Sequence, residues 1–143
     1  MEIGIIGLPK SGKTTVFNAL TRGKAEIGTY TTTGPNVGVA KVPDLRLEAL
    51  DKMFQPKRKI PAEVRYIDVA APTRRELGSE FLAHLSKADG LLHVVRAFED
   101  EKVPHIEGSI DPERDIKLVD LELTFSDPSI VEKRLQKIET SLK

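Results

Sequence analysis

The stretch that most constrains the fold is an octapeptide near the amino end, Gly7-Leu8-Pro9-Lys10-Ser11-Gly12-Lys13-Thr14. It matches the pattern G-x-x-x-x-G-K-[ST] at every required position. Residues 2–6 before it form a short apolar run typical of a buried strand, and residues 15–22 after it carry apolar side chains at helical spacing. The octapeptide therefore lies between an expected strand and an expected helix, which is the context of a phosphate-binding loop.

The residue types of this loop suit a polyphosphate. Gly7 and Gly12 allow a tight turn whose backbone N–H groups point inward, and the helix that follows directs its positive end at the same place. Lys13 is expected to reach the β- and γ-phosphates, Thr14 to give its hydroxyl to Mg²⁺, and Thr15 to touch the α-phosphate. The alternative is a glycine-rich turn that binds nothing, which the matching flanks disfavour. The predicted nucleotide-binding residues are Pro9, Lys10, Ser11, Gly12, Lys13, Thr14 and Thr15.

Strand-like and helix-like patterns alternate along the rest of the chain. Such alternation implies βαβ units and a mostly parallel sheet flanked by helices, with ligands at the carboxyl ends of the strands. After the first strand and helix, we expect strands at residues 37–42, 62–69 and 91–97 and helices at residues 45–54 and 81–89.

Two similar dipeptides predict two helices near the carboxyl end. Asp111-Pro112 and Asp127-Pro128 each combine an acidic N-cap with proline at the first helical position. In the second of these helices, apolar residues recur with a heptad-like spacing that requires a partner helix. These residues are Val131, Leu135, Ile138 and Leu142.

Composition excludes several classes of protein. The 143 residues contain 22 basic and 22 acidic side chains, so no overall basic surface marks a DNA-binding or membrane-binding protein. The absence of cysteine excludes disulfides, thiolate zinc sites and a cysteine nucleophile. No apolar run approaches the length of a membrane span, and the amino end does not resemble a signal peptide. We expect a soluble, cytoplasmic protein.

A magnesium site needs oxygen ligands beside the loop. Asp68 ends the third expected strand, where P-loop proteins place a metal-linked aspartate, although aspartate also commonly caps strand ends. The threonine-rich stretch 31–33 offers a mobile residue that senses the γ-phosphate, or is simply a flexible polar loop. We therefore expect Thr14, Asp68 and one of these threonines around the metal.

Several short stretches occur together in this sequence. They are Gly7-Leu8-Pro9, Thr32 before Pro35-Asn36-Val37-Gly38-Val39, Val42-Pro43-Asp44, Arg46-Leu47, the run from His93 to Asp100, and Asp111-Pro112 before Asp115-Ile116. In combination they resemble the YchF or Obg-like ATPase family of the Obg-related GTPases. The resemblance covers nearly the whole chain, and its motifs are specific only together.

The resemblance implies an α/β G domain, Mg²⁺-dependent binding of GTP or ATP, and association with ribosomes. It selects Thr32 as the switch threonine and makes Asp68 the aspartate of the D-x-x-G element. It also implies that residues 1–126 form an incomplete nucleotide-binding domain and that residues 127–143 begin a helical insertion. In the family, the base-reading segment lies beyond the position that corresponds to residue 143, so the choice between ATP and GTP is not read from these residues.

Two departures from the family's pattern concern hydrolysis. The D-x-x-G element ends in Ala71 instead of glycine, and the stretch after it is shortened. Pro72 stands where small GTPases place a water-orienting glutamine, and the resemblance to this family implies that such a glutamine is absent. His105 matches a loop histidine that in this family is a candidate for handling the attacking water. The sequence alone favours a solvent-exposed loop histidine at this position.

Three functions remain open. The first is a slowly hydrolysing NTPase whose nucleotide state gates a ribosomal partner, with Lys13, Mg²⁺ and positioning supplying the catalysis. The second is a regulatory module that holds nucleotide without useful hydrolysis, as Ala71 and the shortened stretch suggest. The third is a small P-loop kinase, for which Arg74 and Arg75 are the only supporting residues.

Overall fold

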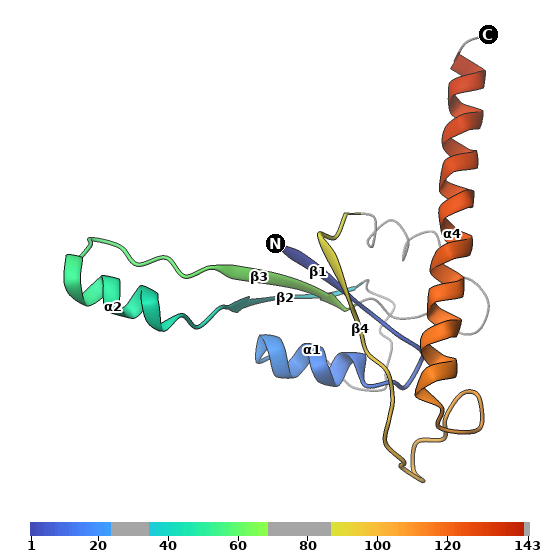
Figure 1. Cartoon of the computed structure of the whole chain (residues 1–143), viewed down its shortest axis with the longest axis horizontal. Coiled ribbons are helices and arrows are strands. Elements are labelled where there is room, and N and C mark those ends of the chain that lie inside the picture. The colour runs from blue at the N-terminus through green and yellow to red at the C-terminus, as the bar shows by residue number, and fades with distance from the viewer. Residues whose placement is uncertain (24–34, 69–86, 142–143) are drawn as a thin grey trace.

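The computed structural model describes residues 1–23, 35–68 and 87–141 (Figure 1). Most of the expected helix at residues 81–89 lies outside this part, as do Thr32, Ala71, Pro72, Arg74, Arg75 and Leu142. The four expected strands and the first two expected helices are confirmed. The elements are β1 (Glu2–Ile6), α1 (Lys13–Thr21), β2 (Asn36–Lys41), α2 (Leu45–Phe54), β3 (Glu63–Asp68), β4 (Gly90–His93) and α4 (Pro112–Ser141).

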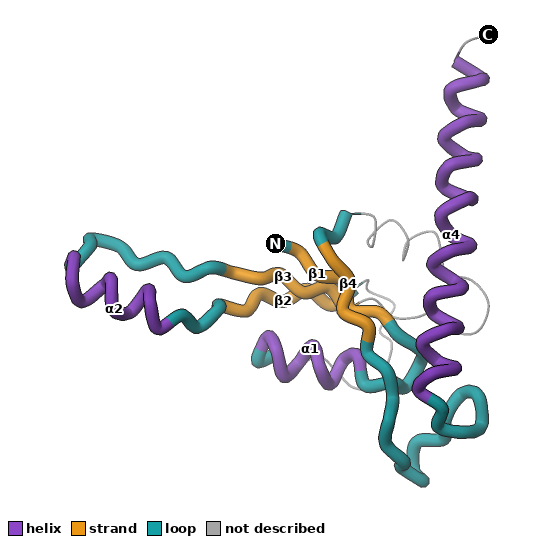
Figure 2. The backbone as a smooth tube through the Cα atoms, viewed as in Figure 1, coloured by secondary structure: helices purple, strands orange, loops and turns teal. Residues whose placement is uncertain are grey.

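The four described strands form one mixed sheet in the order β2-β3-β1-β4 (Figure 2). β1 pairs in parallel with both β3 and β4, so the carboxyl ends of these three strands lie at one edge of the sheet. β2 runs antiparallel to β3, because the excursion that carries α2 away from the sheet returns beside its own start. The predicted mostly parallel sheet flanked by helices is thus confirmed, with one antiparallel edge strand.

β4 ends four residues earlier than predicted. Its last bond to β1 is the one that the Val94 N–H donates to the Ile6 carbonyl, at 2.8 Å. Beyond Ile6 the chain of β1 turns into the loop at Gly7, so residues 95–97 have no strand among the described residues to pair with. The end of β1 therefore sets the end of β4.

The core joins the sheet to α4. Ile6 of β1, Ile67 of β3 and Val119 of α4 are buried together, and Leu8 and Leu123 pack against them. Leu8 belongs to the loop after β1, so this cluster links α4 directly to that loop. Burying such side chains typically contributes about 1.5–3 kcal/mol each, and the cluster therefore anchors the first half of α4 firmly.

The carboxyl end forms one helix and not the two that the sequence predicts. α4 runs through 30 residues with Pro128 inside it, and Asp127-Pro128 does not start a new helix. Proline removes one N–H donor from a helix, which here frees the carbonyl of Thr124. Both residues are exposed, so water can satisfy that carbonyl. Within the described part of the chain, none of the helices combines the length and apolar character needed to cross a lipid bilayer.

Candidate nucleotide-binding site

The loop between β1 and α1 has a backbone that only glycine fits at its first position. Gly7 has φ +144°, and a Cβ added there would lie 2.2 Å from the carbonyl oxygen of Val94. Gly12 caps α1 in the left-handed conformation and offers no side chain to its first N–H groups. These N–H donors, which the helix cannot pair internally, are therefore available to an anion seated in the loop.

Lys13 spans the interior of the loop. Its side chain is buried, with the residue only 4% exposed, and its ammonium donates to the carbonyls of Gly7 and Leu8 at 3.0 and 2.9 Å. Burial lowers the pKa of Lys13 to about 8, although the nearby charge of Asp68 opposes this shift. An ammonium carries three N–H donors, so the third can be given to a phosphate oxygen.

Asp68 and Thr14 meet beside the loop, as the sequence predicts. The Asp68 Oδ2 atom accepts hydrogen bonds from the Thr14 hydroxyl at 2.8 Å and from the Asn36 side-chain amide at 3.3 Å. The other carboxylate oxygen, Oδ1, is buried and has no partner among the described residues. Two adjacent hard oxygen ligands, one of them with spare capacity, fit a Mg²⁺ ion.

The described residues contain no cluster of three or more acidic, histidine or cysteine side chains able to hold a metal alone. Mg²⁺ in nucleotide sites takes one or two protein ligands and completes its shell with phosphate oxygens and water. The Thr14–Asp68 pair fits that kind of coordination. The third predicted metal ligand, Thr32, lies outside the described residues.

The remaining predicted residues line the loop in different ways. The Ser11 hydroxyl is buried without a hydrogen-bond partner among the described residues. Pro9 is half-buried, whereas Lys10 and Thr15 are exposed.

His105 is not the solvent-exposed loop residue that the sequence favoured. Its side chain is 4% exposed, and its Nε2 atom lies 2.9 Å from Oδ2 of Asp115, on the first turn of α4. Its Nδ1 atom accepts the N–H of Glu107 at 3.1 Å. Arg114 donates twice to the other oxygen of Asp115, at 2.8 and 3.0 Å. The buried carboxylate therefore draws the histidine inward; the role of His105 in hydrolysis stays a prediction.

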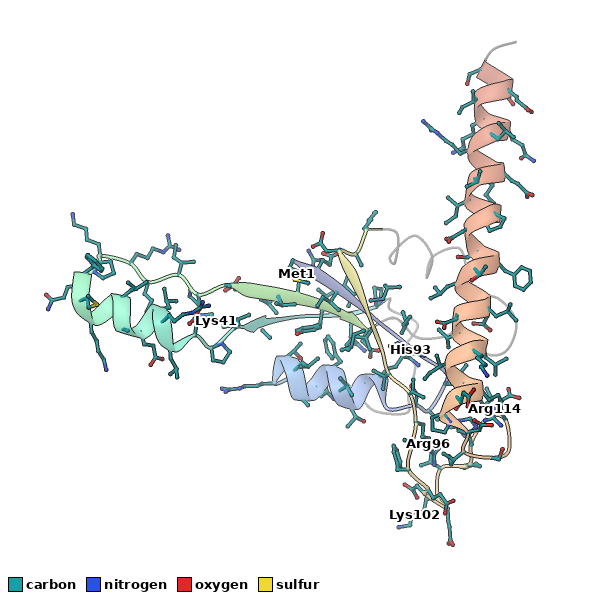
Figure 3. All side chains as sticks on the ribbon, in the orientation of Figure 1. Met1, Lys41, His93, Arg96, Lys102 and Arg114 are labelled. Carbon is teal, nitrogen blue, oxygen red and sulfur yellow. The ribbon has the colours of Figure 1, made fainter. Side chains whose placement is uncertain are left out.

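The sequence assigned no functional role to two further side chains, His93 and Arg96. His93 ends β4, and burial lowers its pKa; Asp120 opposes this lowering and the charge of Lys13 adds to it. Arg96, in the loop after β4 (Figure 3), is 2% exposed, donates to the Phe98 carbonyl at 3.1 Å and stacks over its ring. The only available signal was an arginine embedded in an otherwise apolar run.

Comparison with known proteins identifies the family of this chain. A family model described as "50S ribosome-binding GTPase" matches residues 2–133. The chain is 41% identical over 145 residues to "Ribosome-binding ATPase YchF" of Bacillus subtilis (strain 168), which covers 96% of this chain and 40% of that protein. It is 40% identical over 146 residues to "Obg-like ATPase 1" of Gallus gallus, covering 97% of this chain and 37% of the relative.

A solved structure agrees with these sequence matches. The YchF GTPase of Schizosaccharomyces pombe superposes with a TM-score of 0.71 at 34% identity, over 98% of this chain and 39% of that one. The chain thus spans about two fifths of the length of the relatives that it matches. The phosphate-binding loop and the sheet that positions it lie within the matched part. The chain belongs to the family of 50S ribosome-binding GTPases, on its YchF and Obg-like ATPase branch.

Proposed function

We propose that this chain binds a purine nucleoside triphosphate together with Mg²⁺ and hydrolyses it slowly. The observation that carries the proposal is the assembly of Lys13, Thr14 and Asp68 around a loop whose first residue can only be glycine. In this arrangement an ammonium, the amide groups at the start of α1 and a hard-oxygen pair all face one site. Few ligands other than a polyphosphate with a divalent cation satisfy all three.

Each residue then has a defined task. Lys13 neutralises the β- and γ-phosphates, the N–H groups at the start of α1 orient them, and Thr15 contacts the α-phosphate. Thr14 and Asp68 hold the metal, with Thr32 as the third ligand. Bound Mg²⁺ supplies neutralisation of the charge that develops on the phosphate oxygens. Positioning and electrostatics together account for a slow reaction.

His105 is the candidate for handling the attacking water. Its Nε2 proton is directed at Asp115 and its Nδ1 lone pair is directed at the Glu107 N–H. The imidazole can take a proton from water only if one of these contacts is exchanged. Because both ring nitrogens of His105 already have partners, a second candidate function is favoured, a module that holds nucleotide without useful hydrolysis. Phosphate release measured with Mg²⁺ separates the two, because a pure binding module releases none above background.

We propose that the nucleotide state of this chain gates a ribosomal partner in the cytoplasm. In support of a ribosomal partner, the matching family model and the relative from Bacillus subtilis are both described as ribosome-binding. We also propose that residues 1–126 belong to the nucleotide-binding domain and that residues 127–143 begin a helical insertion. In support, the α4 residues in the core cluster of the described structure are Val119 and Leu123, whereas Val131, Leu135 and Ile138 are 66%, 54% and 45% exposed.

The test is calorimetric titration of the wild type and of Lys13→Ala with ATP and with GTP, each in Mg²⁺. The wild type should bind at least one of them, and Lys13→Ala should lose binding by at least about a hundredfold, since a buried charged donor to phosphate is removed. Lys57→Ala is the matched control, because this exposed lysine lies on the link between α2 and β3. Equal affinity for Lys13→Ala and wild type would rule out the proposed site.

A further inference from the structure

We propose that the side chain of Lys10 supplies a second ammonium to the terminal phosphates of the nucleotide held by this loop. The inference rests on the proposed function and adds to it a residue that separates triphosphate from diphosphate.

The backbone at Lys10 is one that lysine adopts only at a cost. Residues 8–11 form a turn closed by a hydrogen bond from the Ser11 N–H to the Leu8 carbonyl, at 3.2 Å. Pro9 is the second residue of this turn, and Lys10 is the third, with φ +63°. A positive φ at the third position favours glycine or asparagine. For other residues, the Cβ atom then lies too close to the carbonyl oxygen that follows it.

Helix ends explain the other left-handed residues but not Lys10. Besides Lys10, Arg22 and Gln55 are the non-glycine residues with positive φ in the described chain. Arg22 and Gln55 follow α1 and α2 as C-caps, where a left-handed residue ends the helix and satisfies its last carbonyls. Lys10 ends no helix, and its positive φ belongs to the turn of residues 8–11.

The side chain of Lys10 also serves no contact in the described structure. The residue is exposed, and its ammonium makes no hydrogen bond or ion pair with any residue among 1–23, 35–68 and 87–141. Lys13, three positions later, is buried and donates to two carbonyls. An exposed ammonium on this loop that the described fold does not use is available to a ligand of the loop.

The placement of Lys10 selects the ligand. Its flexible stem starts on the same loop whose amides bind the phosphates, so its ammonium can follow the outermost phosphate as a point charge. Lys13 already neutralises the loop interior. A second cation contributed by the same chain favours the species with more negative charge, which is the triphosphate. The diphosphate, lacking the terminal group, should gain little from it.

The experiment compares wild type with Lys10→Gly, Lys10→Asn and Lys10→Arg, using this chain. Titrations use ATP and GTP analogues that resist hydrolysis, and ADP and GDP, all in Mg²⁺; thermal melts are recorded without nucleotide. Lys10→Gly and Lys10→Asn should lose about tenfold in triphosphate affinity, the size expected for one charge-assisted hydrogen bond, with diphosphate affinity unchanged. Their melting temperatures should equal or exceed that of wild type, because both residues tolerate positive φ. Lys10→Arg should retain triphosphate binding, and Lys57→Asn should match wild type.

Unchanged triphosphate affinity in Lys10→Gly and Lys10→Asn would overturn the inference, as would an equal loss for diphosphate. A lower melting temperature in both variants would assign Lys10 a structural role and overturn it too. If Lys13→Ala loses binding and the Lys10 variants do not, only this inference fails. If Lys13→Ala binds as wild type does, or wild type binds no nucleotide, the proposed function fails and this inference with it.

Discussion

The buried ammonium of Lys13 should make nucleotide affinity depend on pH in a window where most lysines do not titrate. Its pKa is lowered from 10.5 to about 8 because burial disfavours the charged form. Only the protonated form can neutralise phosphate, and a bound polyphosphate raises the pKa again. Nucleotide binding above pH 8 must therefore take up a proton, and affinity falls as pH rises.

The magnitude follows from the pKa of about 8. At pH 7 roughly nine tenths of the free protein carries the Lys13 proton, and at pH 9 roughly one tenth does, so affinity should fall about tenfold between them. Stability without nucleotide should change in the opposite direction. Between about pH 8 and pH 10.5 the unfolded chain binds the proton that the folded chain has lost, so Lys13 contributes about 1 kcal/mol of added stability from pH 7 to pH 9.

The assays are calorimetric titration with the preferred triphosphate at pH 7, 8 and 9, and urea unfolding at the same pH values. Lys13→Arg is the control, because a guanidinium stays charged throughout and its affinity should not depend on pH in this range. At each pH, the free energy of unfolding of Lys13→Ala is subtracted from that of the wild type. This subtraction cancels the contributions of groups that titrate elsewhere in the chain. A wild-type affinity that is flat from pH 7 to pH 9, or that falls equally in Lys13→Arg, would refute the reasoning.

Two other variants test the frame of the site. Gly7→Ala should destabilise the fold by about 3 kcal/mol or more, since its Cβ would lie 2.2 Å from the Val94 carbonyl oxygen at φ +144°. In the control variant Gly90→Ala, the added Cβ would have no atom within 4 Å, so its melting temperature should equal that of the wild type. Asp115→Ala should lower the free energy of unfolding in urea by about 3–5 kcal/mol, because it leaves His105 and Arg114 without their buried carboxylate. A loss no larger than that of Glu113→Ala, at an exposed residue, would contradict this prediction.

The loop and Asp68 were predictable because their signals are local. A glycine pattern between a strand and a helix describes one turn of chain, and Asp68 needed only the end of a strand pattern. The antiparallel direction of β2 was not predictable in the same way. It depends on where the excursion through α2 returns, which no short stretch encodes.

The two Asp-Pro dipeptides show the limit of local reasoning most directly. Asp111-Pro112 follows an irregular loop and starts α4, whereas Asp127-Pro128 follows residues that are already helical and remains inside it. The same pair of residues therefore starts a helix or is carried within one, according to what precedes it. His105 likewise required its buried partner Asp115, ten positions away, before its burial could be understood.

The continuity of α4 has a mechanical consequence. The helix is held near the loop between β1 and α1 through Val119 and Leu123, which share a cluster with Leu8, and it continues to Ser141 (Figure 1). At 1.5 Å per residue, the part of α4 beyond Leu123 is about 27 Å long. A tilt of about 5° at its pivot moves the far end by about 2 Å, so a small displacement of Leu8 is magnified several helical turns away.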